Sequence, residues 1–370
     1  MRIFVTGVTG FVGSHIAETL LRAGHEVVGL VRDEAGLDRD LLPWLSRETG
    51  RAPSLDTDAS AGGRDPSGNG PSSALGLDSG QARPAAGNLR LVRGSLGDAG
   101  ALREAAAGAG AVVHVAGLIR ARNEAEFMRV NRDGTEAVLD AVSLAAPGLC
   151  RFVLVSSQAA GGPSRDGRPV RADDPPHPVS AYGRSKRAAE EKSLARAGVV
   201  PVTILRPSVV FGPRDRALLS FFRAVGRGTT IVWGKGGNRF HTVFAPDLAR
   251  AALLAIEREH PSGAILYVAD DAPLSWLTFT RALEKSIGRK ARVLCVPAFV
   301  FSTAAAATTM VSLFTGGHAA LPFDKLKDLR EPAWLCSNEE TRRILGWSPA
   351  VPLEDSLAAT HAWYRTRGLM

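Results

Sequence analysis

The chain has 370 residues, 45% of them hydrophobic and 22% charged, as in a soluble globular protein with one large domain or two closely packed ones. The formal net charge is +8, but the arginines are spread over the whole length without a block of basic residues, so no nucleic-acid surface is predicted. The three cysteines are scattered and form no CxxC pair, which argues against a disulfide framework or a zinc site. The N-terminal stretch MRIFVTG has one arginine and then runs directly into a predicted strand, so no signal peptide is predicted and a cytoplasmic protein is expected.

Short runs rich in β-branched residues alternate with stretches of helical periodicity along most of the chain. Strands are predicted at Arg2–Thr6, Glu26–Val31, near Arg90, from Ala111, from Arg151 and at Val202–Pro207. Helices are predicted at Phe11–Ala23, Leu37–Leu45, Asp98–Ala107, Glu124–Ala145 and Ser180–Ala197. This alternation predicts an α/β fold with a doubly wound parallel sheet and helices on both faces.

One segment, residues 47–88, breaks the alternation. It consists mainly of Gly, Ser, Pro, Ala and Asp, with three leucines and no aromatic residue. Such a composition cannot bury enough apolar surface to offset the entropy of ordering. A disordered, low-complexity insertion is therefore predicted here.

After Pro207 the pattern becomes irregular, as expected of a smaller lobe, and this divides the chain into residues 1–206 and 207–370. The segment from Val293 to Phe323 contains no Asp, Glu, Lys or Arg and is long enough to span a bilayer. Prolines and glycines interrupt it, and its alanine-rich middle is only weakly apolar. A helix that lines an apolar substrate pocket is therefore predicted rather than a membrane span, with peripheral membrane contact left open.

The stretch "VTGVTGFVGSH" directly follows the first strand and opens the first helix. Gly7 permits a tight turn, Gly10 lets a pyrophosphate approach the backbone, and Gly13 allows the helix to pack closely on the strand. The helix N-terminus adds N–H groups and a partial positive charge, so a dinucleotide phosphate site is predicted. The cofactor-binding residues expected in this turn are Gly7, Thr9, Gly10, Phe11, Val12 and Gly13.

The end of the second strand, "GLVRD", is expected to lie next to the adenosine ribose of the cofactor. An acidic residue there accepts from a 2′-hydroxyl, whereas an arginine favours a 2′-phosphate. Val31 occupies the expected acidic position and Arg32 follows it, so NADP(H) is favoured over NAD(H). Asp33, one place further on, keeps NAD(H) as the alternative.

Further motifs follow in order along the chain: "HVAG" from His114, "VNRDGT" from Val130, "VSS" from Val155, "YGRSK" from Tyr182 and "LRPSVVFGP" from Leu205. With the glycine turn, this series resembles the extended short-chain dehydrogenase/reductase family of NAD-dependent epimerases and dehydratases. The resemblance implies a Rossmann-like sheet of about seven parallel strands with a smaller, mixed α/β C-terminal lobe for the substrate. It also implies a homodimer that forms through helices including Ser180–Ala197.

The resemblance implies a catalytic set of Ser157, Tyr182 and Lys186, with Ser156 as the fallback for the serine. The other cofactor contacts that it implies are Ser95 and Leu96, Ala116 and Gly117, and Pro207 and Val209. Ser95 stands where many relatives have an aspartate that contacts the adenine amine, which is a departure from the pattern. No metal ligand is predicted.

These residue types suit a proton transfer that accompanies hydride transfer. A protonated Lys186 favours the phenolate form of Tyr182, so the pKa of this tyrosine is expected to fall towards neutrality. Ser157 would hydrogen bond the substrate oxygen, and Lys186 would also hold the nicotinamide ribose. In a reduction Tyr182 would give a proton to the carbonyl oxygen, and in an oxidation it would take one.

The choice of reaction depends on the neighbours of this set. Gln158–Ala159 stands where sugar dehydratases carry an acidic pair, so dehydration is not predicted. The tail "GGNRFHTVFAPDLARA" and the apolar segment resemble the 3β-hydroxysteroid dehydrogenase and dihydroflavonol reductase-like branch. An NAD(P)-dependent oxidoreductase is therefore predicted, acting on a bulky, mostly apolar alcohol or ketone of sterol-like or flavonoid-like kind. A nucleotide-sugar 4-epimerase would use the same Ser157, Tyr182 and Lys186 and is the alternative, although Arg239 stands without the rest of the pattern that binds a sugar diphosphate. A non-catalytic nucleotide-binding assembly subunit is the rival from another class.

Overall fold

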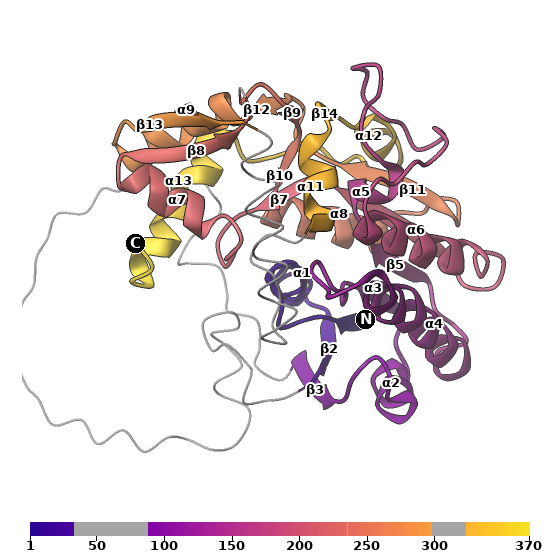
Figure 1. Ribbon diagram of the computed structural model, residues 1–370. Coiled ribbons are helices and arrows are strands. Elements are labelled where there is room, and N and C mark those ends of the chain that lie inside the picture. Colours follow the sequence, from indigo (N-terminus) through magenta and orange to yellow (C-terminus); the bar gives the residue numbers. More distant parts are fainter. Residues whose placement is uncertain (33–87, 235, 298–322) are drawn as a thin grey trace, which may run out of the picture.

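The computed structural model describes residues 1–32, 88–234, 236–297 and 323–370, and its centre is a sheet of seven parallel strands (Figure 1). In spatial order the strands are β11 (Ala264–Val268), β6 (Val202–Pro207), β5 (Arg151–Val155), β4 (Ala111–His114), β1 (Arg2–Thr6), β2 (Glu26–Val31) and β3 (Leu89–Arg93). Every neighbouring pair in this order is parallel. The predicted doubly wound parallel sheet, with seven strands, is confirmed.

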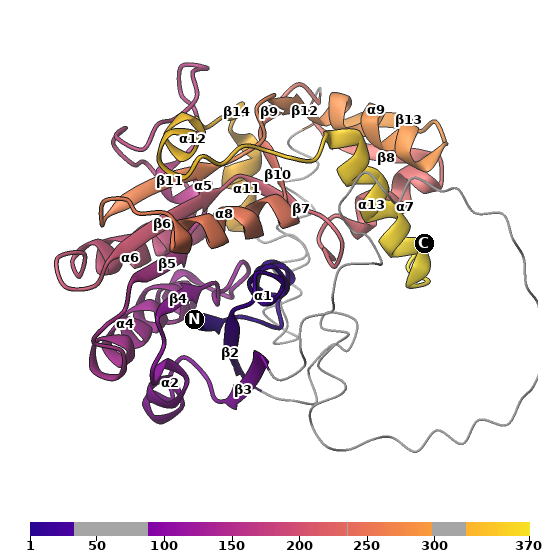
Figure 2. The same ribbon diagram turned by 180° about the vertical axis from the view of Figure 1, so that it is seen from behind.

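Helices cover both faces of the sheet, as the two views show (Figures 1 and 2). On one face lie α1 (Phe11–Arg22) and α8 (Ala245–Glu257), and on the other lie α2 (Ala99–Ala106), α4 (Gly134–Ala145) and α6 (Ala181–Leu194). Alternate residues of β1 separate the two cores, because Ile3 and Val5 pack with α1 and α8 whereas Phe4 packs with the other three helices. With both faces covered, the inner strands are apolar along their length, which is why the sequence shows them as short hydrophobic runs.

A third, aromatic core lies in the distal lobe, which follows β6 along the chain. The helices that contribute to this core are α7 (Leu219–Gly226), α9 (Trp276–Ile287) and α13 (Leu353–Thr366). Two further helices lie in this part of the chain, α11 (Phe323–Arg330) and α12 (Glu339–Leu345), and α12 packs on β11 and α8 of the central sheet. Its short strands are β7 (Val209–Phe211), β8 (Thr229–Trp233), β9 (Arg239–Phe240), β10 (Thr242–Phe244), β12 (Leu274–Ser275), β13 (Arg292–Val296) and β14 (Ala333–Trp334). Phe211, Phe222, Phe240, Phe279 and Tyr364 are buried in this core. β11 follows residue 206 in the chain but belongs to the central sheet, so the two parts are interleaved in sequence. The division of the chain at residue 206 stays a prediction.

Two predicted helices differ from the structure. The stretch predicted as one helix over Glu124–Ala145 is α3 (Glu124–Phe127), a π-helix (Met128–Asp133) and then α4. A π-helical turn inserts an extra residue into the helix, frequently at a functional site, and hydrophobic periodicity does not reveal it. The start of the apolar segment, predicted as helix, is strand β13, which pairs in parallel with β8.

Some predictions fall on residues outside the described ranges. They are the helix at Leu37–Leu45, nearly all of the insertion at 47–88, Asp33, and residues 298–322 of the apolar segment. Among the described helices, none is both long enough and apolar enough to span a bilayer.

Candidate active site

The glycine turn after β1 has a shape that only glycine allows. Gly7 has a φ of +71°, and a Cβ there would lie 2.8 Å from the backbone nitrogen of Ala116. A Cβ on Gly13 would lie 2.0 Å from the carbonyl oxygen of Gly7. Gly10 begins α1 as its N-cap, and no side chain caps this end of the helix. The first N–H groups of α1 therefore lie next to this glycine turn, and this arrangement accommodates a dinucleotide pyrophosphate.

A buried series of hydrogen-bonded side chains stabilises the residues next to this turn. The Thr6 hydroxyl accepts from the backbone N–H groups of Val115 and Ala116, at 3.2 and 3.1 Å, and contacts Nδ1 of His114 at 2.7 Å. Nε2 of His114 lies 3.0 Å from the Thr135 hydroxyl. Burial, and to a lesser degree the charge of Lys186, lowers the pKa of His114 to about 3. His114 is therefore neutral, and it links Thr6, which precedes the glycine turn, to Thr135 on α4. The Thr6 hydroxyl itself holds the turn after β4 that contains Ala116.

Ser157 and Tyr182 meet at the carboxyl end of β5. Ser157 begins the short helix α5 (Gln158–Gly161), and its hydroxyl accepts from the Ala159 N–H at 3.2 Å. A hydrogen bond between the Ser157 and Tyr182 side chains works to lower the pKa of the tyrosine. Ser156 instead donates to a carboxylate in the interior, Glu190, at 2.6 Å. This arrangement favours Ser157 over Ser156 as the serine that faces a substrate.

Lys186 lies one helical turn after Tyr182 on α6 and is only 6% exposed. Its Nζ donates to the carbonyl oxygen of Val155 at 2.7 Å. Burial lowers the pKa of Lys186 to about 8, while the charge of Glu190 raises it. The three members of the predicted catalytic set therefore lie together, two on α6 and one after β5.

The pKa of Tyr182 differs from the sequence-based expectation. Burial, the largest effect, raises it above the ordinary value, and the charge of Asp328 raises it further, while the hydrogen bond with Ser157 acts in the opposite direction. The Lys186 ammonium donates to a backbone carbonyl and is not among the groups that lower it. Tyr182 is therefore protonated at neutral pH, as a proton donor must be.

Asn131, in the π-helix, was not predicted as a site residue, although it stands in the quoted motif "VNRDGT". Its Oδ1 accepts from the Leu118 N–H at 2.7 Å, and its Nδ2 donates to the Leu118 carbonyl and to the Ser185 hydroxyl. A Cβ on Gly117 would lie 2.9 Å from that Oδ1, which explains the glycine. Asn131 thus joins the turn after β4 to the helix that carries Tyr182.

Asp324, far away in the sequence, caps the catalytic helix. Both of its carboxylate oxygens lie 2.9 Å from the Ala181 N–H, and one lies 3.4 Å from the Tyr182 N–H. A carboxylate at this position is favoured by the positive end of the helix dipole. Asp324 lies in the first turn of α11, so this contact joins α11 to the helix of the residue that would donate the proton.

The remaining predicted cofactor residues lie at the same carboxyl edge of the sheet. Arg32 directly follows β2 and is exposed, Pro207 ends β6, and Val209 begins β7 with 37% of its surface exposed. The Ser95 hydroxyl accepts from the Gly97 N–H at 3.3 Å, so it stabilises its own turn after β3. Leu96 lies beside the start of α4, because a Cβ on Gly134 would lie 2.7 Å from its Cδ1.

A seven-stranded parallel sheet with a glycine turn after its first strand, and a Ser–Tyr–Lys group at the carboxyl edge, defines an extended short-chain dehydrogenase/reductase. Residues 3–269 match the NAD dependent epimerase/dehydratase family, and the chain belongs to that family. The predicted family, and with it a nicotinamide-dependent oxidoreductase, is confirmed.

Curated relatives of the chain include proteins named as reductases and dehydrogenases. It is 31% identical over 281 residues to a ceramide reductase from Caulobacter vibrioides, covering 76% of this chain and 82% of the relative. It is 29% identical to a 4-hydroxy-2-methyl-3-oxo-4-farnesyl-3,4-dihydroquinoline-1-oxide ketoreductase from Stigmatella aurantiaca, covering 97% and 95%. It is 26% identical to a sterol-4-alpha-carboxylate 3-dehydrogenase from Saccharomyces cerevisiae, covering 69% and 76%.

A solved structure shows the same fold. The structure of a double mutant of DesIV, a dTDP-glucose 4,6-dehydratase from Streptomyces venezuelae with NAD and DAU bound, matches with a TM-score of 0.72. The match covers 100% of this chain and 98% of that one at 23% identity.

Proposed function

We propose that this protein is an NAD(P)-dependent reductase of a bulky, mostly apolar ketone, of the general size and polarity of a long-chain lipid or sterol. The observation that carries the proposal is the contact of Ser157 with a protonated Tyr182, beside Lys186 and at the same sheet edge as the glycine turn. The reverse oxidation of the corresponding alcohol would use the same residues.

The turn from Gly7 to Gly13 and the start of α1 would hold the cofactor phosphates. The bound nicotinamide would supply a hydride to the carbonyl carbon of the substrate. Ser157 would donate a hydrogen bond to the carbonyl oxygen and stabilise the charge that develops on it. Tyr182 would then give its hydroxyl proton to that oxygen. Lys186, one helical turn along α6 from Tyr182, would hold the nicotinamide ribose hydroxyls.

The neighbours of Ser157 and the names of the relatives support this substrate class. Gln158 replaces the acid that a dehydration would need, and it is buried with no hydrogen-bond partner for its Nε2 among the described residues. The relatives are named for ceramide, for a farnesylated quinoline and for a sterol, which are all large and mostly apolar. The uncharged segment from Val293 to Phe323 would suit an apolar substrate of that kind.

A cofactor absorbance screen tests this function. Purified protein with NADPH or NADH is offered long-chain 3-ketolipids, sterol ketones, prenylated quinolones, small aldehydes and nucleotide sugars. We expect net oxidation of the reduced cofactor only with the bulky apolar ketones. Turnover confined to small aldehydes would contradict the proposal. A tightly held cofactor with interconversion of nucleotide sugars would support the 4-epimerase instead, and cofactor binding without any turnover would support an assembly subunit.

We further propose NADP(H) as the preferred cofactor, with Arg32 as the group that pairs with the 2′-phosphate. Arg32→Ala is then expected to lower the ratio of kcat/KM for NADPH to that for NADH by about 10- to 100-fold, the value of one charge-assisted hydrogen bond. Steady-state kinetics with both cofactors measure this ratio. Arg103→Ala, which removes an exposed arginine on α2, serves as the matched control. An unchanged ratio in Arg32→Ala would assign the preference to other residues.

Two properties of the whole protein complete the proposal. We propose a homodimer formed through the α4 and α6 surface, and light scattering at several concentrations tests it, with a monomer at all of them as the contrary result. We propose a cytoplasmic location because the three cysteines form no pair in the sequence, and fractionation of expressing cells tests it. Recovery of the protein in the membrane fraction would favour peripheral membrane contact instead.

A further inference from the structure

Three residues on one face of α6 contact the end of β5 in succession. Tyr182, Lys186 and Glu190 are spaced four residues apart and so lie one above another on the helix. Tyr182 contacts the Ser157 hydroxyl, Lys186 contacts the Val155 carbonyl, and Glu190 contacts the Ser156 hydroxyl. The row therefore continues beyond the predicted catalytic pair to a third residue with its own contact.

Glu190 is completely buried, and both of its carboxylate oxygens are hydrogen bonded. Oε1 accepts from the Ser156 hydroxyl at 2.6 Å and from Nε of Arg206 at 2.9 Å, and Oε2 accepts from Nη2 of Arg206 at 2.7 Å. Arg206, on β6, is 1% exposed. This is a bidentate buried ion pair, the form of ion pair with the most defined geometry.

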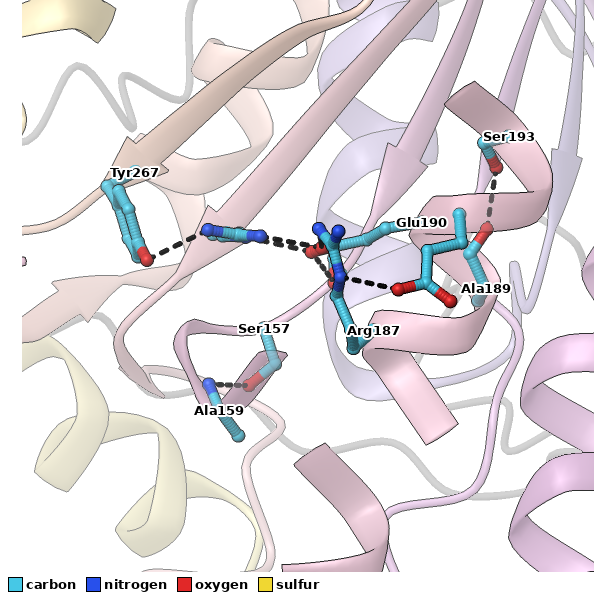
Figure 3. Close-up of polar contacts among 10 residues, drawn as sticks. Ser157, Ala159, Arg187, Ala189, Glu190, Ser193 and Tyr267 are labelled. Carbon is cyan, nitrogen blue, oxygen red and sulfur yellow. Dashed lines mark hydrogen bonds and ion pairs between the residues drawn. The ribbon is translucent and has the colours of Figure 1, made fainter. Parts of the chain in front are cut away.

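The pair continues to β11 through Tyr267. Nη1 of Arg206 donates to the Tyr267 hydroxyl at 3.0 Å, and the guanidinium carbon lies 5.3 Å from the centre of the Tyr267 ring. Figure 3 shows Tyr267 at one end of these contacts, Glu190 near the other, and Ser157 beside them. A Cβ on Gly161 would lie 2.0 Å from the Tyr267 hydroxyl, so the last residue of α5 packs directly on it.

The loop that carries Ser157 is thus fixed at both ends by one network. Ser156, on one side of Ser157, is bonded to Glu190, and Gly161, at the other end of α5, packs on Tyr267. We propose that Glu190 and Arg206, with Tyr267, form a positioning unit for proton transfer. The unit holds the Ser157 hydroxyl on Tyr182 and places a fixed negative charge one helical turn from Lys186. The proposed role rests on the proposed function, because it concerns the proton that Tyr182 would donate.

Other charged groups face the same residues. His114 on β4 is neutral, and Asp328 on α11 acts on Tyr182. Glu190 is paired with Arg206 from β6 and also accepts from Nη1 of Arg187, on its own helix, at 3.5 Å. Of these groups, Glu190 is the one that raises the pKa of Lys186 against burial. Removal of its charge must therefore lower that pKa further, so that Lys186 loses its proton at a lower pH.

Glu190→Gln keeps the shape of the side chain and removes its charge. We expect kcat for the reduction to fall by about 10- to 100-fold, as for a mispositioned proton donor, while the dissociation constant of NADPH changes by less than about threefold. The alkaline limit of the kcat/KM profile should move to lower pH by about one unit. If Glu190→Gln lowers the stability of the protein but leaves kcat and the pH profile unchanged, the ion pair has only a structural role and the proposal is overturned.

Two further variants separate position from charge. Ser156→Ala removes the anchor and keeps the charge, so kcat should fall while the pH profile stays in place. Glu284→Gln serves as the matched control, because Glu284 is also buried and also pairs with an arginine, Arg281, but lies on α9. It should lower stability and leave both kcat and the pH profile unchanged. If Glu190→Gln does not fold, the single variants Ser156→Ala and Tyr267→Phe replace it. An unchanged kcat in both of them overturns the proposal.

A titration that needs no turnover separates this proposal from the proposed function. The chain has seven lysines, so ¹³C-lysine labelling gives few signals, and Lys186→Arg identifies the Lys186 resonance. The Lys186 midpoint should lie below that of an exposed lysine in the wild-type protein and lower again in Glu190→Gln. An unchanged midpoint overturns the role of the charge even if the substrate screen succeeds. If the substrate screen fails but the Lys186 midpoint is shifted in Glu190→Gln, only the proposed ketone reduction is refuted.

Discussion

Tyr182→Phe is expected to lower kcat for the reduction by about 10²- to 10⁴-fold, the usual contribution of a positioned general acid. Phenylalanine keeps the ring, which lies 5.9 Å from the ring of Phe127, and removes only the hydroxyl that Ser157 contacts. The packing of the helix start therefore stays the same while the proton source disappears. Stopped-flow measurement of cofactor oxidation under single-turnover conditions reports this step directly.

Tyr364 provides the control for this variant. Tyr364 is fully buried and its hydroxyl donates to the Asp215 carbonyl at 2.6 Å, away from Tyr182 in the distal lobe. Tyr364→Phe should reduce stability by about 1–3 kcal/mol, the cost of one unsatisfied buried group, and leave kcat unchanged. The dissociation constant of NADPH should stay within about threefold in both variants. Near-normal turnover in Tyr182→Phe would show that the proton comes from another group.

Much of the fold could be predicted because its signals are local. Each inner strand of the sheet is a short apolar run, and the glycine turn follows β1 within a few residues. Tyr182 and Lys186 are four residues apart on one helix, so one spacing places both. For Ser157 the motif left Ser156 open, and the alternation of side chains after β5 separates the two.

What the sequence does not show is mostly long-range. Glu190, Arg206 and Tyr267 lie on three different elements, and a single sequence does not mark which charged residues will be buried together. Asp324 reaches Ala181 across 143 positions, and a capping residue from so far away has no local signal. The π-helix is invisible for a different reason, since one extra residue in a turn changes the apolar periodicity too little to detect.

The expected pKa of Tyr182 illustrates the same limit. Spacing alone suggests that Lys186 lowers it, but the effect depends on burial and on where the ammonium points. In the structure the ammonium donates to Val155, and burial raises the pKa of Tyr182. A raised pKa suits the reductive direction, because it keeps the phenol protonated until the oxygen of the substrate gains negative charge.

Gly13→Ala is expected to abolish cofactor binding, with an increase of at least about 100-fold in the dissociation constant of NADPH, which corresponds to about 2.7 kcal/mol. The new methyl group would lie 2.0 Å from the Gly7 carbonyl oxygen and 2.7 Å from its carbonyl carbon, so the backbone turn itself must move. A displaced turn no longer presents the start of α1 to the phosphates. Overpacking of this kind also costs about 1–3 kcal/mol of stability. Fluorescence titration with NADPH and chemical denaturation measure the two effects.

Gly148→Ala is the matched control for the glycine turn, because a Cβ at Gly148 meets no atom within 4 Å. It should leave both the dissociation constant and the stability close to those of the wild-type protein. If Gly13→Ala loses stability but binds NADPH as tightly as the wild-type protein, the phosphates are held elsewhere. Residues other than those at the start of α1 would then bind the cofactor phosphates. The close approach of Gly13 to the backbone of Gly7 would serve only the packing of α1.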